Sequence, residues 1–148
     1  VVRLVGSEMC IRARYQVMTT PLQQALTYAC LENAGKIMKP CYTLDEEPEV
    51  WIDTGTSQEN IDFIKNALRD AVTVQHPSAD ASDVGANVYA KTGTAEVGDG
   101  KAAHGWFVGF LNDEAHPYAF VCLVENGGSG LGAAGSVINT VLQAAVAK

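Results

Sequence analysis

The stretch that decides the fold is two consecutive runs, Asn87-Val88-Tyr89-Ala90-Lys91-Thr92-Gly93-Thr94-Ala95 and His104-Gly105-Trp106-Phe107-Val108-Gly109-Phe110-Leu111. Both are strand-like, and Gly98-Asp99-Gly100 supplies turn chemistry between them. A third strand-like run follows at Tyr118–Glu125, after the turn residues Asn112-Asp113. Short links between strands predict an antiparallel meander.

Helix signals flank these strands. Thr20, Pro21 and Gln23 form a capping box with proline at the first helical position, and Asn33-Ala34-Gly35 is a typical stop. Residues 36–53 are expected to be extended chain and loop. A second capping box, from Thr56 to Glu59, predicts a helix that ends before residues 75–77, with a buried face made of Ile61, Ile64, Leu68, Ala71 and Val72.

A last helix is predicted over residues 133–147, with an apolar face made of Val137, Val141, Leu142 and Ala145. Two helices, three strands and one helix predict an α+β fold, an antiparallel sheet covered by helices.

Composition limits the function classes. The 148 residues are 47% hydrophobic, which suits one domain or a large part of one. The net charge is −7 and the basic residues are scattered singly, so nucleic-acid binding is not expected. The four cysteines have irregular spacings and are interpreted as small apolar residues. No apolar run approaches the roughly 20 residues of a membrane span.

The chemistry is concentrated in Lys91-Thr92-Gly93-Thr94. Lys91 supplies a fixed cation, Thr92 a hydroxyl, and Thr94 a backbone N–H. Gly93 has no side chain, so a ligand backbone can approach closely. Together these groups form a receptor for a carboxylate and a developing oxyanion. An ordinary edge strand with a surface lysine is the alternative interpretation.

The other motifs in the sequence are weaker indications of a function. Gly130-Leu131-Gly132-Ala133-Ala134-Gly135 satisfies G-x-G-x-x-G, but a dinucleotide site needs an acidic residue about 20 positions later, and none follows Gly135. A tight exit into a closely packed helix is expected instead. His76, His104 and His116 lack metal-site spacing, so no metal or cofactor is expected. His104 is a candidate for lining a cleft, and Glu96 is interpreted as a solvated turn carboxylate.

Five stretches resemble the class B penicillin-binding proteins, which are peptidoglycan D,D-transpeptidases, in family order and spacing. The resemblance extends over roughly residues 19–147, most of the chain, whereas residues 1–18 depart from the family and are left unassigned. The matching stretches are Thr19-Thr20-Pro21-Leu22-Gln23-Gln24-Ala25, Asn33-Ala34-Gly35-Lys36-Ile37-Met38-Lys39-Pro40, Ala90-Lys91-Thr92-Gly93-Thr94-Ala95-Glu96, His104-Gly105-Trp106-Phe107-Val108-Gly109-Phe110 and Val124-Glu125-Asn126-Gly127-Gly128.

The resemblance implies the C-terminal portion of the penicillin-binding transpeptidase and serine β-lactamase-like fold, with three strands of a central five-stranded antiparallel sheet. It implies that Lys91, Thr92, Gly93 and Thr94 bind a peptidoglycan stem peptide or a β-lactam, with the Thr94 N–H in the oxyanion hole. It also implies a longer protein at the extracytoplasmic face of a bacterial membrane. The 118–125 strand would be an open edge, unless Val1–Val5 pairs with it, and open edges favour self-association.

Two elements of the family are missing from the sequence. None of the six serines is followed by lysine three residues later or by asparagine two residues later, so S-x-x-K and S-x-N are both absent. In the family both elements precede the T-P-L-Q helix and would lie before residue 1. The chain is therefore expected to be inactive alone, and a non-catalytic interaction or assembly module is the alternative function.

Overall fold

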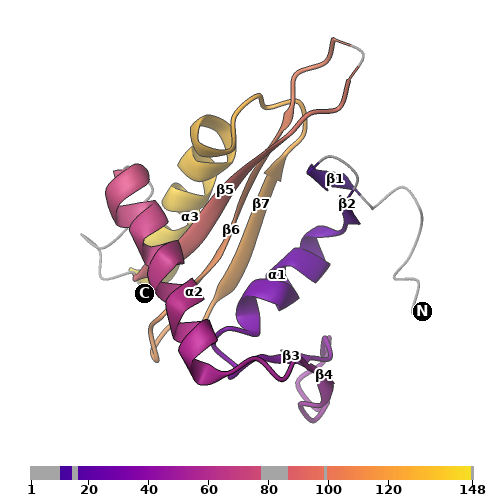
Figure 1. The fold of residues 1–148 in the computed structure, drawn as a ribbon, viewed down its shortest axis with the longest axis vertical. Helices are drawn as coiled ribbons and strands as arrows, with labels where there is room; N and C mark the ends of the chain where they lie inside the picture. The colour runs from indigo at the N-terminus through magenta and orange to yellow at the C-terminus, as the bar shows by residue number, and fades with distance from the viewer. Residues whose placement is uncertain (1–10, 15–16, 78–86, 99, 148) are drawn as a thin grey trace.

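The computed structural model describes residues 11–14, 17–77, 87–98 and 100–147. Its centre is a sheet of β5 (Val88–Ala95), β6 (His104–Leu111) and β7 (Ala119–Val124), antiparallel in the order β5-β6-β7 (Figure 1). The predicted meander is confirmed. The expected alternative partner of β7, Val1–Val5, lies outside the described residues.

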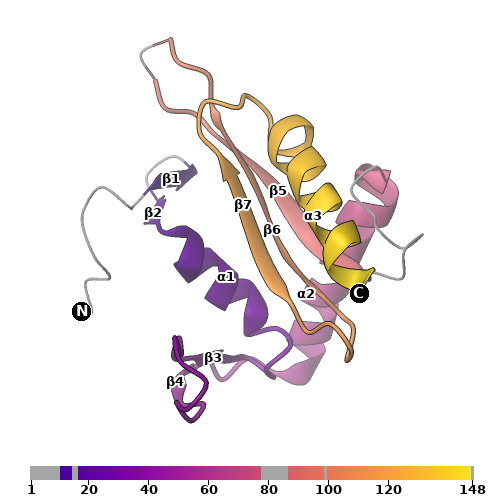
Figure 2. The same ribbon diagram turned by 180° about the vertical axis from the view of Figure 1, so that it is seen from behind.

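Side-chain alternation along the strands divides the core between the two faces of the sheet. On one face, Val88, Ala90, Phe107 and Leu111 form a buried cluster with residues of the C-terminal helix. On the other face, Ala95, Trp106 and Val108 are buried, and Tyr28 of the first helix packs against them. Figures 1 and 2 show these two helices on opposite sides of the sheet.

Helix α1 (Pro21–Ala29) begins as the sequence predicts. The Thr20 hydroxyl accepts a hydrogen bond from the Gln23 N–H at 3.1 Å, and Gln23 Oε1 accepts one from the Thr20 N–H at 2.8 Å. The helix ends before the predicted stop at Asn33-Ala34-Gly35: its last residue is Ala29 and its C-cap is Cys30. A turn follows, in which the chain passes through positive φ at Ala34 (51°) and Gly35 (79°).

Helix α2 (Gln58–Asp70) corrects two expectations. Its N-cap is Ser57, whose Oγ accepts from the Asn60 N–H, whereas the Thr56 hydroxyl is 2.9 Å from that of Thr54. Ile64 is 40% exposed rather than buried. The reason is that α2 flanks the β5 edge of the sheet, so only a narrow apolar stripe is covered. The π-helical turn η2 (Ala71–Gln75) follows and ends at the predicted place.

Helix α3 (Ser136–Val146) follows a π-helical turn, η5 (Gly130–Gly135). Its predicted apolar face was wrong in part: Ile138 and Leu142 are buried, whereas Val137 and Val141 are 50% and 52% exposed. Ile138 and Leu142 are four residues apart and share a face, which α3 directs toward the sheet.

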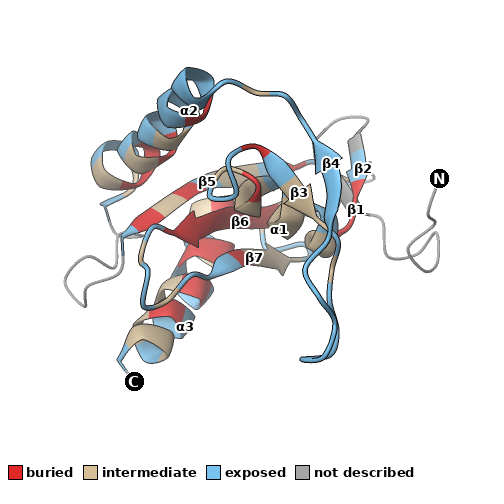
Figure 3. Ribbon diagram, turned by 90° about the horizontal axis from the view of Figure 1, so that it is seen from below, coloured by how far each residue is buried: buried red, intermediate tan, exposed pale blue. Residues whose placement is uncertain are grey.

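Two small hairpins complete the structure. β1 (Ile11–Arg14) pairs with β2 (Val17–Thr19), and β3 (Lys36–Met38) pairs with β4 (Val50–Asp53). Figure 3 shows that the β3–β4 hairpin and its loop are mostly exposed. Of the described helices, none is both long and apolar enough to cross a membrane.

Candidate functional site

The outer edge of β5 carries the groups that the sequence singled out. The Val88 carbonyl accepts from Arg69 Nη1 of α2 at 2.9 Å, and the Leu111 N–H donates away from β5, to the Tyr118 carbonyl at 2.8 Å. Val88 and Leu111 are therefore a non-hydrogen-bonded pair of the β5–β6 ladder. Since such pairs alternate with hydrogen-bonded ones, the backbone N–H and C=O groups of Ala90, Thr92 and Thr94 also point outward.

Lys91 lies at this edge with its ammonium group exposed. Its Nζ donates to the Thr92 carbonyl at 2.9 Å, and that carbonyl is one of the outward-pointing groups. In the ladder Lys91 stands opposite Val108, an apolar neighbour that offers no counter-charge. The Lys91 cation and the outward N–H groups of Thr92 and Thr94 therefore lie along a single strand edge.

The Thr92 hydroxyl has a neighbour that the sequence did not predict. His76, which follows η2, places Nε2 at 3.4 Å from Thr92 Oγ1. From the sequence, His76 was a candidate only as a metal ligand. The two residues are 16 positions apart, so no local pattern signals this contact, and only the packing of η2 against β5 creates it.

Gly93 and Thr94 are supported from behind by the turn η5. The Gly130 N–H donates to Thr94 Oγ1 at 3.4 Å. A Cβ on Gly130 would lie 2.4 Å from the Gly93 carbonyl oxygen and 2.6 Å from that of Trp106. This close approach accounts for the glycine-rich sequence, which was expected to be a tight exit into a packed helix. Gly93 itself faces the Trp106 side chain, whose Cβ a Gly93 Cβ would meet at 3.2 Å.

His104 and Glu96 lie at the end of the same two strands. His104 is paired with Ala95, and its Nδ1 accepts from the Asn126 N–H at 3.0 Å, which assigns the ring proton of a neutral His104 to Nε2. Nε2 of this tautomer is a hydrogen-bond donor. Glu96 is exposed, as expected of a turn carboxylate. Among the described residues, no group of His, Cys, Asp or Glu side chains could hold a metal ion.

The site is bounded by helix and hairpin. Arg69 of α2 covers the start of the β5 edge, at Val88, and β1 also contacts β5. The hairpin of β1 and β2 lies toward the end of the sheet from which the β5–β6 connection projects (Figures 1 and 2).

On the α1 face, burial raises the pKa of the Tyr28 hydroxyl, so that side chain stays neutral at physiological pH.

Comparison with protein families gives a match to the penicillin binding protein transpeptidase domain over residues 10–143. The chain belongs to this family. The match includes the β5 edge, α1 and most of α3, so the resemblance seen in five separate stretches is confirmed over most of this chain. No curated protein matches the chain.

Solved structures agree with this transpeptidase-domain assignment. PBPA from Mycobacterium tuberculosis is 24% identical, with a TM-score of 0.74 over 90% of this chain and 36% of that one. Penicillin-binding protein A from M. tuberculosis as an imipenem acyl-enzyme complex is 25% identical, with a TM-score of 0.71 over 88% and 32%. The D,D-transpeptidase domain of a peptidoglycan glycosyltransferase from Eggerthella lenta is 24% identical, with a TM-score of 0.65 over 86% and 32%. The chain thus spans about a third of these relatives.

Replacing Gly130 by alanine tests the support of the β5 edge by η5. The added Cβ would collide with backbone oxygens of both β5 and β6, which are not free to move aside. We expect Gly130→Ala to lower the free energy of unfolding by about 1–3 kcal/mol or more, the usual cost of overpacking. Backbone amide resonances of residues 92–94 should also shift. Urea unfolding and NMR spectra measure the two effects.

Gly135→Ala is the matched control at the end of the same turn. Its Cβ would meet the end of the Leu131 side chain, at 3.2 Å from Cδ1, and that side chain can move aside. Equal losses of stability in the two variants would contradict the proposed close approach.

Proposed function

We propose that the β5 edge is the substrate-binding side of a peptidoglycan D,D-transpeptidase site, with the serine nucleophile supplied by a part of the longer protein outside residues 1–148. The observation that carries this proposal is the outward edge itself: the Lys91 cation lies beside the outward N–H groups of Thr92 and Thr94. The solved relative that forms an imipenem acyl-enzyme supports β-lactams as ligands.

An extended stem peptide suits this edge. A peptide strand can add to an exposed sheet edge through main-chain hydrogen bonds, with Thr92 and Thr94 as the groups available for pairing. The Lys91 ammonium would attract the terminal carboxylate of the stem peptide, or the carboxylate of a β-lactam. The Thr94 N–H would stabilise the oxyanion that develops as the acyl carbonyl is attacked. Gly93 carries no side chain that would hold the peptide away.

Acylation also needs an activated nucleophile with a base beside it. No serine of the sequence has the S-x-x-K spacing. In the structure, the hydroxyls of Ser57 and Ser129 accept from backbone N–H groups as helix caps, and Ser136 Oγ donates to the carbonyls of Gly132 and Ala133. These three serines, the ones among the described residues, are used for local structure. Together with the missing S-x-x-K spacing, this supports a chain that supplies binding groups without the reacting atom.

The presence of binding groups without an S-x-x-K serine also favours a second candidate function, a non-catalytic interaction or assembly module. Both functions suit a longer protein at the extracytoplasmic face of a bacterial membrane, where its substrate would be found. They differ in one feature: a transpeptidase must bring a serine nucleophile to the Lys91 side of β5, whereas a module need not.

We expect the 148-residue chain to form no covalent adduct with a labelled penicillin, because it lacks an activated serine. Intact-mass spectrometry after prolonged incubation is the measurement, with a complete penicillin-binding protein as the positive control. A mass increase of one drug molecule that maps to any of the six serines would show that the chain carries its own nucleophile.

In the longer protein, Lys91→Ala should slow acylation by a β-lactam about 100-fold or more, the usual cost of losing a group that stabilises the transition state. Stopped-flow acylation rates measure this effect. Lys101→Ala is the matched control, since Lys101 is an exposed lysine of the β5–β6 connection. Similar acylation rates in the two variants and the unmodified protein would remove Lys91 from the site.

The outer edge of β7 provides a basis for self-association. Since the Leu111 N–H donates to Tyr118, alternation along the ladder directs the N–H groups of Ala119, Val121 and Leu123 outward. Among the described residues, no strand pairs with this edge. We propose that the isolated chain is of marginal stability as a monomer and dimerises through this edge.

Ala119→Pro should weaken such a dimer, because proline removes an outward N–H without breaking a ladder bond to β6. Ala119→Val keeps the N–H and is the control. Sedimentation and thermal melts over a concentration series measure the effect. A monomer whose high melting temperature does not depend on concentration would overturn the proposal.

A further inference from the structure

The β3–β4 hairpin with its connecting loop, residues 36–53, forms a separate unit at one end of the molecule; we name it the acidic hairpin. Its strands make a two-stranded sheet that is not joined to β5–β7. Figure 3 shows strand β4 and most of the loop exposed. A two-stranded hairpin is at best marginally stable in water on its own. Contacts between β3 and α1 and the hydrogen bond from the Thr54 N–H to the Gly35 carbonyl join the unit to the rest of the chain, while most of its residues stay exposed.

The acidic hairpin exposes an unusual number of large apolar side chains. In β4, Val50, Trp51 and Ile52 are 46%, 42% and 47% exposed. In the loop, Tyr42 is 73% exposed and Leu44 is fully exposed. Single exposed apolar residues are ordinary on a protein surface, but a group of five on one small unit is typical of an interaction site.

The backbone of β4 distributes these side chains over both faces of the hairpin. Ile37 pairs with Ile52 and Met38 with Val50, so Trp51 is an extra residue that the ladder skips. Such a bulge bends the strand and redirects the side chain of the extra residue. It also makes continuous strand pairing along β4 unfavourable. The apolar side chains are thus placed to contact another surface, rather than to extend a sheet.

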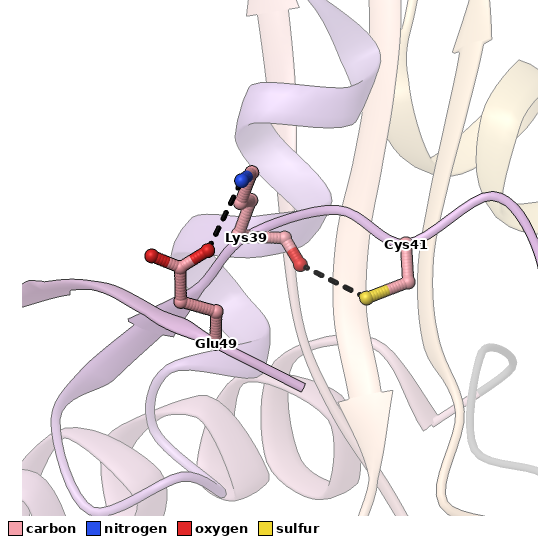
Figure 4. A network of polar contacts seen from close by, with 3 residues as sticks. All are labelled: Lys39, Cys41 and Glu49. Atoms are coloured by element: carbon pink, nitrogen blue, oxygen red, sulfur yellow. Dashed lines mark hydrogen bonds and ion pairs between the residues drawn. The ribbon is translucent and has the colours of Figure 1, made fainter. Parts of the chain in front are cut away.

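The charge of the acidic hairpin is strongly negative. Between Lys39 and Asp53 it has five carboxylates and one lysine. That lysine is already paired, because Lys39 Nζ lies 3.0 Å from Glu49 Oε2, and the hydrogen bond and charge of Glu49 raise the Lys39 pKa (Figure 4). Lys36, the other lysine of the hairpin, stands opposite Asp53 in the ladder. The loop carboxylates of Asp45, Glu46 and Glu47 have no lysine or arginine among residues 40–48.

The loop is also held in a defined shape. The Lys39 N–H donates to the Glu49 carbonyl at 2.8 Å, which closes the base of the loop. The Cys41 thiol donates to the Lys39 carbonyl at 3.7 Å (Figure 4), and the Thr43 hydroxyl donates to Glu46 at 2.9 Å. A preformed loop lowers the entropy cost of binding.

We propose that the acidic hairpin docks onto a protein segment that combines lysine or arginine side chains with apolar ones. The apolar part of the partner covers Val50, Trp51 and Ile52, and its cations meet Glu46 and Glu47. Charge decides between possible occupants. A second copy of this chain would bring a second acidic loop against the first, and an anionic lipid surface would repel both. This docking surface is independent of the β5 edge.

The test uses the 148-residue chain and a synthetic 12-residue peptide that alternates lysine and valine. The chain has two tryptophans, and Trp106 is only 3% exposed, so its indole N–H resonance is an internal reference for that of Trp51. We expect the peptide to shift the Trp51 resonance saturably while the Trp106 resonance stays in place. The same peptide with glutamate in place of lysine should cause no shift, since it repels the hairpin.

Two variants with matched controls separate the apolar and charged contributions. Val50→Ser with Ile52→Ser should weaken peptide binding about tenfold or more, as expected when central apolar contacts of an interface are removed. Phe63→Ser is the control, because Phe63 is 74% exposed on α2. Glu46→Lys with Glu47→Lys should abolish the shift at low salt, whereas Asp62→Lys with Glu114→Lys, which makes the same change of net charge elsewhere, should retain most of it.

The proposal is overturned if the lysine peptide leaves the Trp51 resonance unmoved, or if the two peptides act equally. It is also overturned if the two charge variants lose binding alike, because binding then depends on net charge alone. A Trp51 shift on adding vesicles of anionic phospholipid would assign the surface to membranes. Burial of Trp51 in a dimer, seen as a concentration-dependent shift that the serine variant removes, would assign it to a second copy.

Discussion

The pairing of β5 with β6 is the constraint on which the rest of the structure depends. Eight consecutive residue pairs join the strands, from Val88–Leu111 to Ala95–His104. Because side chains alternate between faces, this register decides which residues enter each of the two buried clusters. It also decides which backbone groups of β5 remain outside the ladder. A shift of one residue would direct the Thr94 N–H into β6 and bury Lys91 with the aliphatic core.

Close backbone packing keeps this arrangement in place. A Cβ on Gly109 would lie 2.2 Å from the Tyr89 carbonyl oxygen, and one on Gly130 would lie 2.4 Å from that of Gly93. The first glycine permits β5 and β6 to pair tightly, and the second brings η5 against the strand that carries the binding groups. The G-x-G-x-x-G pattern at residues 130–135 therefore permits close packing of the backbone within the chain. In dinucleotide-binding proteins the same pattern binds a phosphate.

The surfaces that remain open have different chemistry. The β5 edge presents a cation and outward-pointing backbone N–H groups, which suit an anionic extended peptide. The β7 edge presents backbone groups among aliphatic side chains, and no strand of the described residues pairs with it. The acidic hairpin presents carboxylates around Trp51. Because each surface selects by a different interaction, occupation of one does not require the others.

The sequence by itself determined the elements whose signals are local. The capping box of Thr20 and Gln23 and the β6 boundaries agree with the sequence, and the capping box depends only on atoms within a few residues of one another. The motif at Lys91–Thr94 was visible as chemistry, and its resemblance to a family was carried by several stretches in order. The tertiary structure decided what depends on distant contacts. It moved the cap of α2 to Ser57, turned Ile138 rather than Val137 toward the sheet, and brought His76 to Thr92. These outcomes follow from how each helix docks on the sheet, because periodicity gives a helix an apolar stripe but leaves its rotation to the surface that it covers.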